Sequence, residues 1–155
     1  DRASLLRHYD INVAGPLLLT QAFANNLASH PGIVVNITDH KLFNPNADHF
    51  AYTLSKFALQ AANDLLARQL APRIRVCAVA PGHVLPGPGE TMAHFEAVHT
   101  DTPLGRGVTP DDIADAVAYI DASPTLTGQT IIVDAGAHLQ PRLRDQTLAP
   151  PLGRT

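Results

Sequence analysis

The 155-residue sequence contains a single cysteine, Cys77, so no disulfide can form within the chain. Cys77 stands in an apolar run, where a free cysteine ordinarily acts as a small buried hydrophobic residue. A reducing, cytoplasmic setting is therefore expected. The sequence also lacks the roughly 18 consecutive apolar residues that a membrane-spanning helix needs, and no secretory signal pattern opens it. We therefore expect no membrane partner.

Basic residues are few as well. Eleven lysines and arginines stand against 14 aspartates and glutamates, for a formal net charge of -3. Without a basic cluster of the kind that follows a phosphate backbone, nucleic acid is not an expected partner. The eight histidines form no H-E-x-x-H motif, and His94 and His99 are spaced too far apart to share a helix face. We therefore predict no metal site.

The sequence also lacks a G-x-G-x-x-G dinucleotide loop after any predicted strand. It begins at Asp1 and opens directly in a helical pattern, so we expect further sequence upstream of this residue. Three predicted strands make a poor sheet by themselves. The chain is therefore expected to be a part of a larger fold.

The apolar periodicity predicts helices alternating with short β-branched strands. Parallel strands joined by crossover helices, and hence an open α/β sheet, follow from this order. Cap residues support the helix that begins after Thr109, where Pro110 occupies the first position. The predicted elements are a long buried helix over residues 4–28, a strand over 33–37, a helix over 48–70, a strand over 74–80, a loop over 82–107 with one weak helical turn, a helix from 110, a strand over 130–133 and a loose tail over 141–155.

Tyr52 and Lys56 are four residues apart on a predicted helix, so both side chains lie on one face. An ammonium group beside a phenol lowers the phenol pKa, which is about 10 unperturbed, and this suits proton transfer in carbonyl or imine reduction. The alternative is a packed tyrosine beside a solvated lysine. With only three tyrosines and two lysines in the chain, however, chance gives this spacing in roughly one such sequence in twenty.

The surroundings of this pair resemble those of the classical short-chain dehydrogenases/reductases. Tyr52-Thr-Leu-Ser-Lys56 matches the family's Tyr-x-x-x-Lys motif and follows a strand and a polar loop, as in the family. Further segments that resemble the family are Asn12-Val13-Ala14-Gly15, Ala80-Pro81-Gly82, Pro103-Leu104-Gly105-Arg106, Pro110-Asp111-Asp112-Ile113-Ala114, Thr127-Gly128-Gln129 and Val133-Asp134-Ala135-Gly136. The resemblance implies a doubly wound, Rossmann-like parallel sheet, of which residues 1–140 form the C-terminal catalytic half without the N-terminal βαβ units.

The resemblance also implies roles for individual residues. Tyr52 is expected to protonate the substrate, and Lys56 to hold the ribose hydroxyls of the nicotinamide cofactor. Tyr52, Lys56, Pro81, Gly82 and Val84 form the expected cofactor-binding set. NADPH is the expected cofactor, with NAD as the open alternative.

Asn12 has a physical argument of its own. Pro16 lies four residues on and has no N–H, so the Asn12 carbonyl loses its helical partner and the helix should bend. A free buried carbonyl needs a donor. The resemblance implies a water at this carbonyl that relays protons to Lys56; the alternative is an incidental kink filled by solvent.

Asp39 departs from the common family pattern, which places a serine 13 residues before the tyrosine. An acid here resembles the pteridine, dihydromonapterin and dihydrofolate reductases of the same family. A carboxyl group suits the ring nitrogens and amino groups of a pterin as acceptor or proton source. Burial should raise the pKa of Asp39 and Lys56 should lower it, which leaves its protonation state open. The alternative is a loop or cap residue in an enzyme that has lost activity.

These features predict a catalytic set of Asn12, Asp39, Tyr52 and Lys56 and a substrate-binding set of Asp39, Tyr52 and Leu85. The predicted reaction is reduction of a dihydropterin-like C=N bond with a nicotinamide cofactor. Two alternatives stay open: a carbonyl or alcohol dehydrogenase of the same family, and a truncated, non-catalytic chain that serves as an oligomer partner. The resemblance implies a homodimer or homotetramer that acts on a small-molecule substrate.

Overall fold

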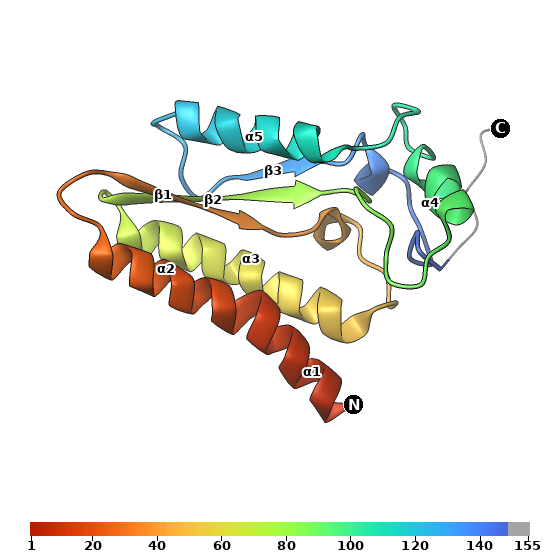
Figure 1. Cartoon of the computed structure of the whole chain (residues 1–155), viewed down its shortest axis with the longest axis horizontal. Helices are drawn as coiled ribbons and strands as arrows, with labels where there is room; N and C mark the ends of the chain where they lie inside the picture. The colour runs from red at the N-terminus through yellow and green to blue at the C-terminus, as the bar shows by residue number, and fades with distance from the viewer. Residues whose placement is uncertain (149–155) are drawn as a thin grey trace.

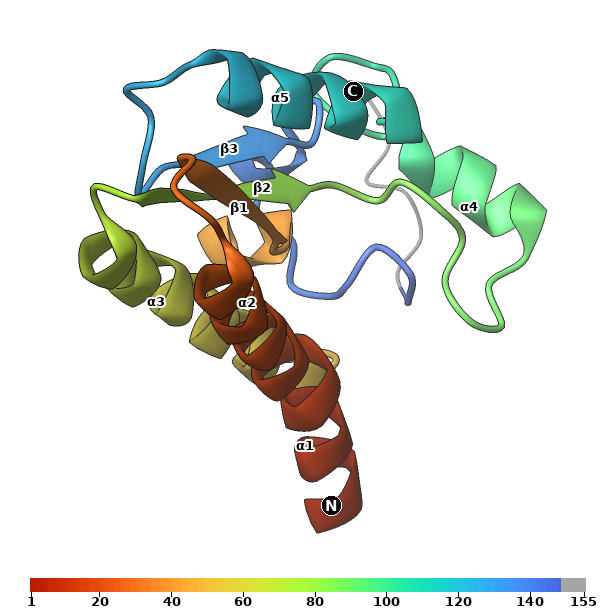
Figure 2. The ribbon, with the colours of Figure 1, turned by 60° about the vertical axis from the view of Figure 1, so that its left-hand side comes forward.

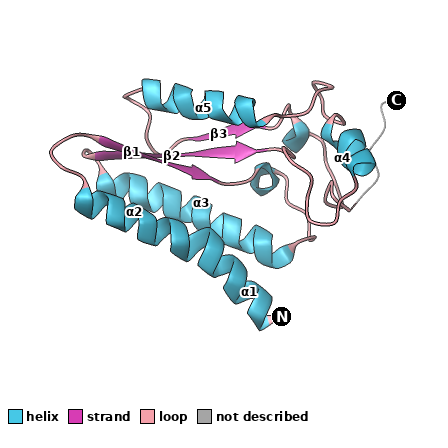
Figure 3. Ribbon diagram, viewed as in Figure 1, coloured by secondary structure: helices cyan, strands magenta, loops and turns pink. Residues whose placement is uncertain are grey.

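The computed structural model describes residues 1–148 as a three-layer α/β arrangement (Figure 1). Strands β1 (Gly32–Ile37), β2 (Ile74–Pro81) and β3 (Thr130–Val133) form one parallel sheet in the order β1-β2-β3, and all three point the same way (Figure 3). The predicted parallel α/β sheet is thereby confirmed. The helices are α1 (Arg2–Tyr9), α2 (Gly15–Asn26), α3 (Phe50–Leu70), α4 (Met92–His99) and α5 (Pro110–Ala122), with a π-helical turn at Asp10–Ala14 and 3-10 segments at His40–Phe43 and Ala137–Leu139.

Strand β2 is the centre of the core because helices cover both of its faces. Successive side chains of a strand point to opposite faces. Ile74 and Val76 therefore pack among residues of α2 and α3, whereas Cys77 and Val79 pack beneath α5. Figure 1 shows this division, with α5 on one side of the sheet and α2 and α3 on the other. Cys77 is fully buried, as predicted.

Helix α5 is capped at both ends. The Thr109 side chain accepts from the Asp112 N–H, and the Asp112 carboxylate accepts in return from the Thr109 N–H, which forms a capping box with Pro110 at the first position. This confirms the predicted helix start. At the other end, the Arg75 guanidinium of β2 donates to the Ile120 carbonyl at 2.9 Å, which satisfies a group that the helix end leaves unpaired.

The N-terminal region differs from the prediction of one long buried helix. Helices α1 and α2 are separated by the π-helical turn, and α1 extends away from the sheet (Figure 2). Leu5, Leu6 and Leu18 are exposed, Leu18 by 64%. Apolar spacing shows that a helix has an apolar face, but it does not show whether the rest of the chain covers that face.

Strand β1 is covered on both faces, as its β-branched run predicts: Val34 packs on the side of α2 and α3, and Ile33 and Val35 pack on the side of α5. Among residues 1–148 it is also one of the two edge strands of the sheet. Ile37, at its end, is exposed. Side chains of β1 and α2 together with residues of the π-helical turn line an open groove of about 650 Å³, here called the β1 groove. Its lining is mostly apolar and includes Phe23 and Leu59. One strand edge therefore lies open beside the sheet.

Residues 141–148 were expected to be loose, and this is wrong. Lys41 pairs with Asp145 at 2.8 Å, and Arg144 pairs with Asp48 at 2.7 Å. These ion pairs fasten the segment to the turn after β1 and to the residues before α3. Residues 149–155 of the expected tail lie outside the described residues.

The loop after β2 contains more structure than the single weak turn that was predicted. Helix α4 has eight residues, and its N-cap Thr91 accepts a hydrogen bond from the N–H of His94. Phe95 and Val98 are its buried residues. None of the helices among residues 1–148 combines the length and hydropathy that crossing a membrane requires.

Candidate active site

A pocket of about 820 Å³ opens at the carboxyl ends of the strands, where open α/β sheets commonly bind ligands. Its wall is built from the turn after β1, the first residues of α3, the loop after β2 and the chain after β3. Four predicted site residues line it together: Asp39, Tyr52, Gly82 and Leu85. We call this the β-end pocket.

Asp39 and Tyr52 are joined directly in the β-end pocket. The Tyr52 hydroxyl donates to Asp39 Oδ2 at 2.5 Å, and Asp39 Oδ1 accepts from the Lys41 N–H at 2.8 Å. Tyr52 lies in the first turn of α3, and Asp39 is the N-cap of the 3-10 segment His40–Phe43. The local turn therefore holds the carboxylate against the phenol.

The pKa of Tyr52 moves in the direction opposite to the one expected. Burial, followed by the negative charge and hydrogen bond of Asp39, raises the pKa of the phenol well above its ordinary value of 10.0. The expected lowering by Lys56 is wrong because the group that touches the hydroxyl is an acid. The phenol is therefore favoured in its protonated form, which donates the hydrogen bond to Asp39.

Lys56 lies on the same face of α3, as predicted, with Nζ 5.7 Å from the centre of the Tyr52 ring. Its ammonium donates to the carbonyl of Ile37 at 2.9 Å, and burial lowers its pKa against the opposing charge of Asp39. An ammonium has three N–H donors, and residues 1–148 use one of them. Lys56 therefore has two further N–H donors, one helical turn from the Tyr52 hydroxyl. Such a pair of groups could bind the two hydroxyls of a ribose.

Asn12 lies in the π-helical turn, which confirms the helix distortion predicted from Pro16. The N–H of Gly15 donates to the Asp10 carbonyl five residues back, as in a π-turn. The Asn12 amide donates to Ser55 Oγ at 2.9 Å, and Ser55 in turn donates to the Tyr52 carbonyl at 2.6 Å. A short chain of hydrogen bonds thus ties Asn12 to the backbone of Tyr52.

The predicted residues are divided between two hollows. Asn12 and Lys56 line the β1 groove, whereas Asp39 and Tyr52 line the β-end pocket. Pro81 and Val84, predicted to meet the nicotinamide, line neither of the two. Gly82 sits where a Cβ would lie 2.9 Å from the Asp134 backbone, so a larger residue would push the two segments apart.

Sequence reasoning missed a cluster around Asp134, at the end of β3. Oδ2 of Asp134 accepts from Nδ1 of His40 at 3.2 Å and from Nδ1 of His138 at 2.8 Å. Burial opposes ionisation, but these bonds and backbone donors from His138 and Gly136 outweigh it and lower the pKa of Asp134. His40 was recognisable as a neighbour of Asp39, whereas nothing local in the sequence marks its partner 94 residues away.

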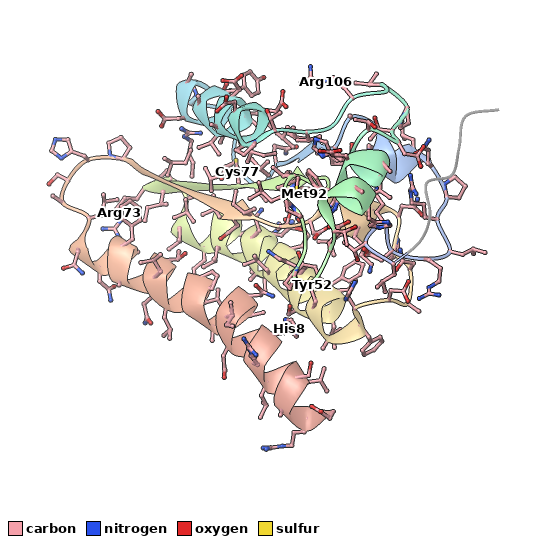
Figure 4. All side chains as sticks on the ribbon, turned by 45° about the vertical axis from the view of Figure 1, so that its right-hand side comes forward. His8, Tyr52, Arg73, Cys77, Met92 and Arg106 are labelled. Carbon is pink, nitrogen blue, oxygen red and sulfur yellow. The ribbon has the colours of Figure 1, made fainter. Side chains whose placement is uncertain are left out.

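Other histidines also lie near the β-end pocket. His8 of α1 is edge-on to Tyr52, with ring centroids 5.9 Å apart (Figure 4). His83 Nε2 is 3.0 Å from Oε2 of Glu90, whose side chain is 3% exposed, and the His83 ring packs against Phe95. Among residues 1–148, no group of three or more histidine, cysteine, aspartate or glutamate side chains is arranged to hold a metal ion.

Comparison with known proteins places this site in a family. A family model described as enoyl-(acyl carrier protein) reductase matches residues 1–138. The chain is 37% identical over 129 residues to carbonyl reductase family member 4 of Danio rerio, covering 83% of this chain and 54% of that protein. It is 29% identical over 137 residues to dihydromonapterin reductase of Klebsiella pneumoniae, covering 86% and 57% of the two chains.

A solved structure resembles this chain in both fold and sequence. FolM alternative dihydrofolate reductase 1 from Brucella suis, in complex with NADP, superposes with a TM-score of 0.87 at 38% identity, over 90% of this chain and 57% of that one. The chain thus spans about half the length of the relatives that it matches. From residue 1 to residue 138, the chain belongs to the short-chain dehydrogenase/reductase family.

Proposed function

We propose that the protein containing this chain is an NAD(P)H-dependent reductase that reduces a C=N bond in a dihydropterin-like substrate. The observation that carries the proposal is the hydrogen bond from Tyr52 to Asp39 inside the β-end pocket. Relatives named as a dihydromonapterin reductase and an alternative dihydrofolate reductase support a pterin substrate. Residues 1–140 form the catalytic half in this proposal, and 141–155 the C-terminal tail.

An acid beside the tyrosine suits an imine better than a ketone. An imine nitrogen takes up a proton as its carbon is reduced, and ring N–H groups need an acceptor nearby. A carboxyl group can accept from such N–H groups when ionised and can supply a proton when it is protonated. An acid at position 39 therefore suits a nitrogen-rich substrate ring better than the serine hydroxyl that is common in the family.

Tyr52 is the proposed donor to the substrate because its raised pKa keeps the phenol protonated. Donation by Tyr52 alone would leave a phenolate beside an ionised Asp39, which is unfavourable in a partly buried site. The proton must therefore be replaced, and because the Asp39 carboxylate has none to give, we assign the replacement to the Lys56 ammonium on the same face of α3. Asp39 accepts the hydrogen bond of the restored phenol. Asn12 is assigned to a relay behind Lys56, supported by its link to Ser55.

The bound nicotinamide would supply the hydride. Tyr52 and Lys56 would hold its ribose, since a hydroxyl and an ammonium with free N–H groups match a diol. Gly82 in the pocket wall, together with Pro81 and Val84, keeps its proposed place at the nicotinamide end of the cofactor. Leu85, also in the pocket wall, is proposed to contact the substrate. NADPH is preferred because the Brucella suis relative was solved with NADP.

A carbonyl reductase is the second candidate, favoured by the 37% identity to the Danio rerio protein. The test is a comparison of initial rates with NADPH on 7,8-dihydrobiopterin and on a panel of ketones, using the gene product that contains this chain. We expect faster turnover of the pterin. Brisk ketone turnover with no pterin turnover would select the carbonyl reductase. No turnover and no change of melting temperature on adding NADPH would select a non-catalytic oligomer partner.

We also propose a homo-oligomer in the cytoplasm. Exposed apolar side chains on α1, α2 and α3, among them Leu19 and Leu65, support a protein contact on these helices. The single buried cysteine supports a reducing compartment.

A further inference from the structure

Two histidine rings in the β-end pocket are held by the same carboxylate oxygen. Asp134 Oδ2 accepts from Nδ1 of His40 and of His138, and also from the His138 backbone N–H at 2.7 Å. Asp134 is almost fully buried, and its other oxygen accepts from the N–H of Gly136 at 2.9 Å. The carboxylate thus serves as a fixed anchor for two imidazoles from different segments of the chain.

This arrangement fixes where each ring carries its proton. Hydrogen-bond donors contact both oxygens of Asp134 and lower its pKa, although burial opposes this. The carboxylate is therefore ionised, and an ionised carboxylate can only accept hydrogen bonds. Each Nδ1 must therefore carry a hydrogen. In a neutral imidazole with hydrogen on Nδ1, Nε2 is a hydrogen-bond acceptor.

Both acceptors remain available to a ligand. His40 and His138 line the β-end pocket together with Asp39 and Tyr52, and their side chains are 17% and 24% exposed. Within residues 1–148, neither Nε2 has a hydrogen-bond partner. Phe43 packs edge-on against His138, with ring centroids 6.4 Å apart, which further limits rotation of that ring. The pocket wall thus presents two oriented acceptors next to the reacting groups.

We propose that Nε2 of His40 and Nε2 of His138 accept hydrogen bonds from N–H donors of the substrate and so determine its specificity. The matching chemistry is an amino-substituted, nitrogen-rich ring edge, which offers several N–H groups side by side. His40 directly follows Asp39 in the chain and lines the same pocket, so one substrate ring could meet the histidines and the reacting groups at the same time. The inference rests on the proposed reduction of a dihydropterin and identifies the part of the substrate that the pocket recognises.

The test compares two substrates in the gene product that contains this chain. One is a dihydropterin with its 2-amino group, and the other is the same compound with methyl in place of that group. The wild type should favour the amino compound by about tenfold in kcat/KM, the value of one or two net hydrogen bonds. His40→Phe and His138→Phe should each reduce this preference, and the double variant should bring it to within about twofold. His40→Gln, which can place an amide oxygen near the Nε2 position, should retain part of it.

The ratio of two substrates measured on one variant cancels losses of folded protein, so a purely structural role of the histidines would leave it unchanged. His30→Phe, in the exposed loop before β1, is the matched control and should keep the wild-type ratio. An unchanged ratio in the double variant overturns the inference.

If the wild type reduces neither compound, the proposed function fails, but the inference is still tested by calorimetric titration of both compounds in the presence of NADP. A wild-type preference for the amino compound that the double variant loses would support the histidine site. Equal binding of both compounds by the wild type would overturn it.

Discussion

The hydroxyl of Tyr52 donates a 2.5 Å hydrogen bond to Oδ2 of Asp39, which pairs two residues 13 positions apart around one proton. The structure restrains both members of this pair. Tyr52 belongs to the first turn of α3, and the Lys41 N–H holds the other oxygen of Asp39. A phenol in this setting retains its proton, which suits a reductase that must donate one.

Asp39→Asn should lower the pKa of Tyr52 toward its ordinary value of about 10, because the substitution removes the nearby negative charge. Burial remains and should keep the pKa somewhat above that value. The ultraviolet absorbance of tyrosinate during a pH titration measures this, with Tyr52→Phe identifying the signal against Tyr9 and Tyr119. A Tyr52 titration unchanged in Asp39→Asn would mean that Asp39 does not hold the phenol in solution.

Pro16→Ala should convert the π-helical turn toward regular α-helix, because alanine restores an N–H four residues after Asn12. The shift should break the 2.9 Å hydrogen bond from Asn12 to Ser55 and lower turnover. A crystal structure of the variant provides the measurement. Pro110→Ala is the matched control, since an N–H at the first position of α5 needs no helical partner. Retention of the π-turn in Pro16→Ala would show that Pro16 is not its cause.

The ionisation of Asp145 should make the free energy of unfolding depend on pH. Burial opposes ionisation, but hydrogen bonds from Lys41 and Thr147 lower its pKa to about 2, below the unfolded value of 3.8. The ionised carboxylate therefore stabilises the fold above about pH 4, and this contribution is lost as the pH falls through about 2. Because Asp145 is partly exposed to solvent, we expect this contribution to the free energy of unfolding to be about 1 kcal/mol.

Denaturant unfolding of the wild type and of Asp145→Asn from neutral pH downward measures this contribution. The variant should be less stable at neutral pH, because Lys41 is left buried without its partner, and the difference should shrink toward about pH 2. Asp64→Asn, on the exposed side of α3, should behave like the wild type. A difference between the wild type and Asp145→Asn that does not vary with pH would argue against the ion pair.

Leu19→Glu should weaken the proposed homo-oligomer, because Leu19 of α2 is 72% exposed and a charge would have to be desolvated in a contact there. Light scattering coupled to gel filtration would show a smaller species. Leu143→Glu is the matched control: Leu143 is 95% exposed in the segment after β3, and its substitution should leave the mass unchanged. Identical masses for wild type and Leu19→Glu would remove this face of α2 from the interface.

The features that could be predicted from the sequence depend on local patterns. The spacing of Tyr52 and Lys56 fixes their common helix face, and Thr109 with Asp112 fixes the start of α5. Proline lacks an N–H in any surroundings, so Pro16 alone predicts the helix distortion at Asn12.

The features that sequence reasoning missed depend on contacts between distant segments. His40 meets Asp134 across 94 residues, and Lys41 meets Asp145 across 104, with no periodicity to mark either pair. The direction of the Tyr52 pKa shift was missed for a related reason. It depends on which charged group touches the hydroxyl, and the spacing of four to Lys56 does not reveal this.

The most direct test of a pterin-directed acid is the substrate preference of Asp39→Ser, which gives the pocket the hydroxyl common in the family. With NADPH, kcat/KM for a dihydropterin should fall about 100-fold or more, the usual contribution of a positioned acid–base group. The rate on a ketone should hold or rise. Tyr52→Phe should abolish both activities and serves as the control for residual turnover. Equal losses on the two substrates, or an unchanged rate on the dihydropterin, would contradict the assignment of Asp39.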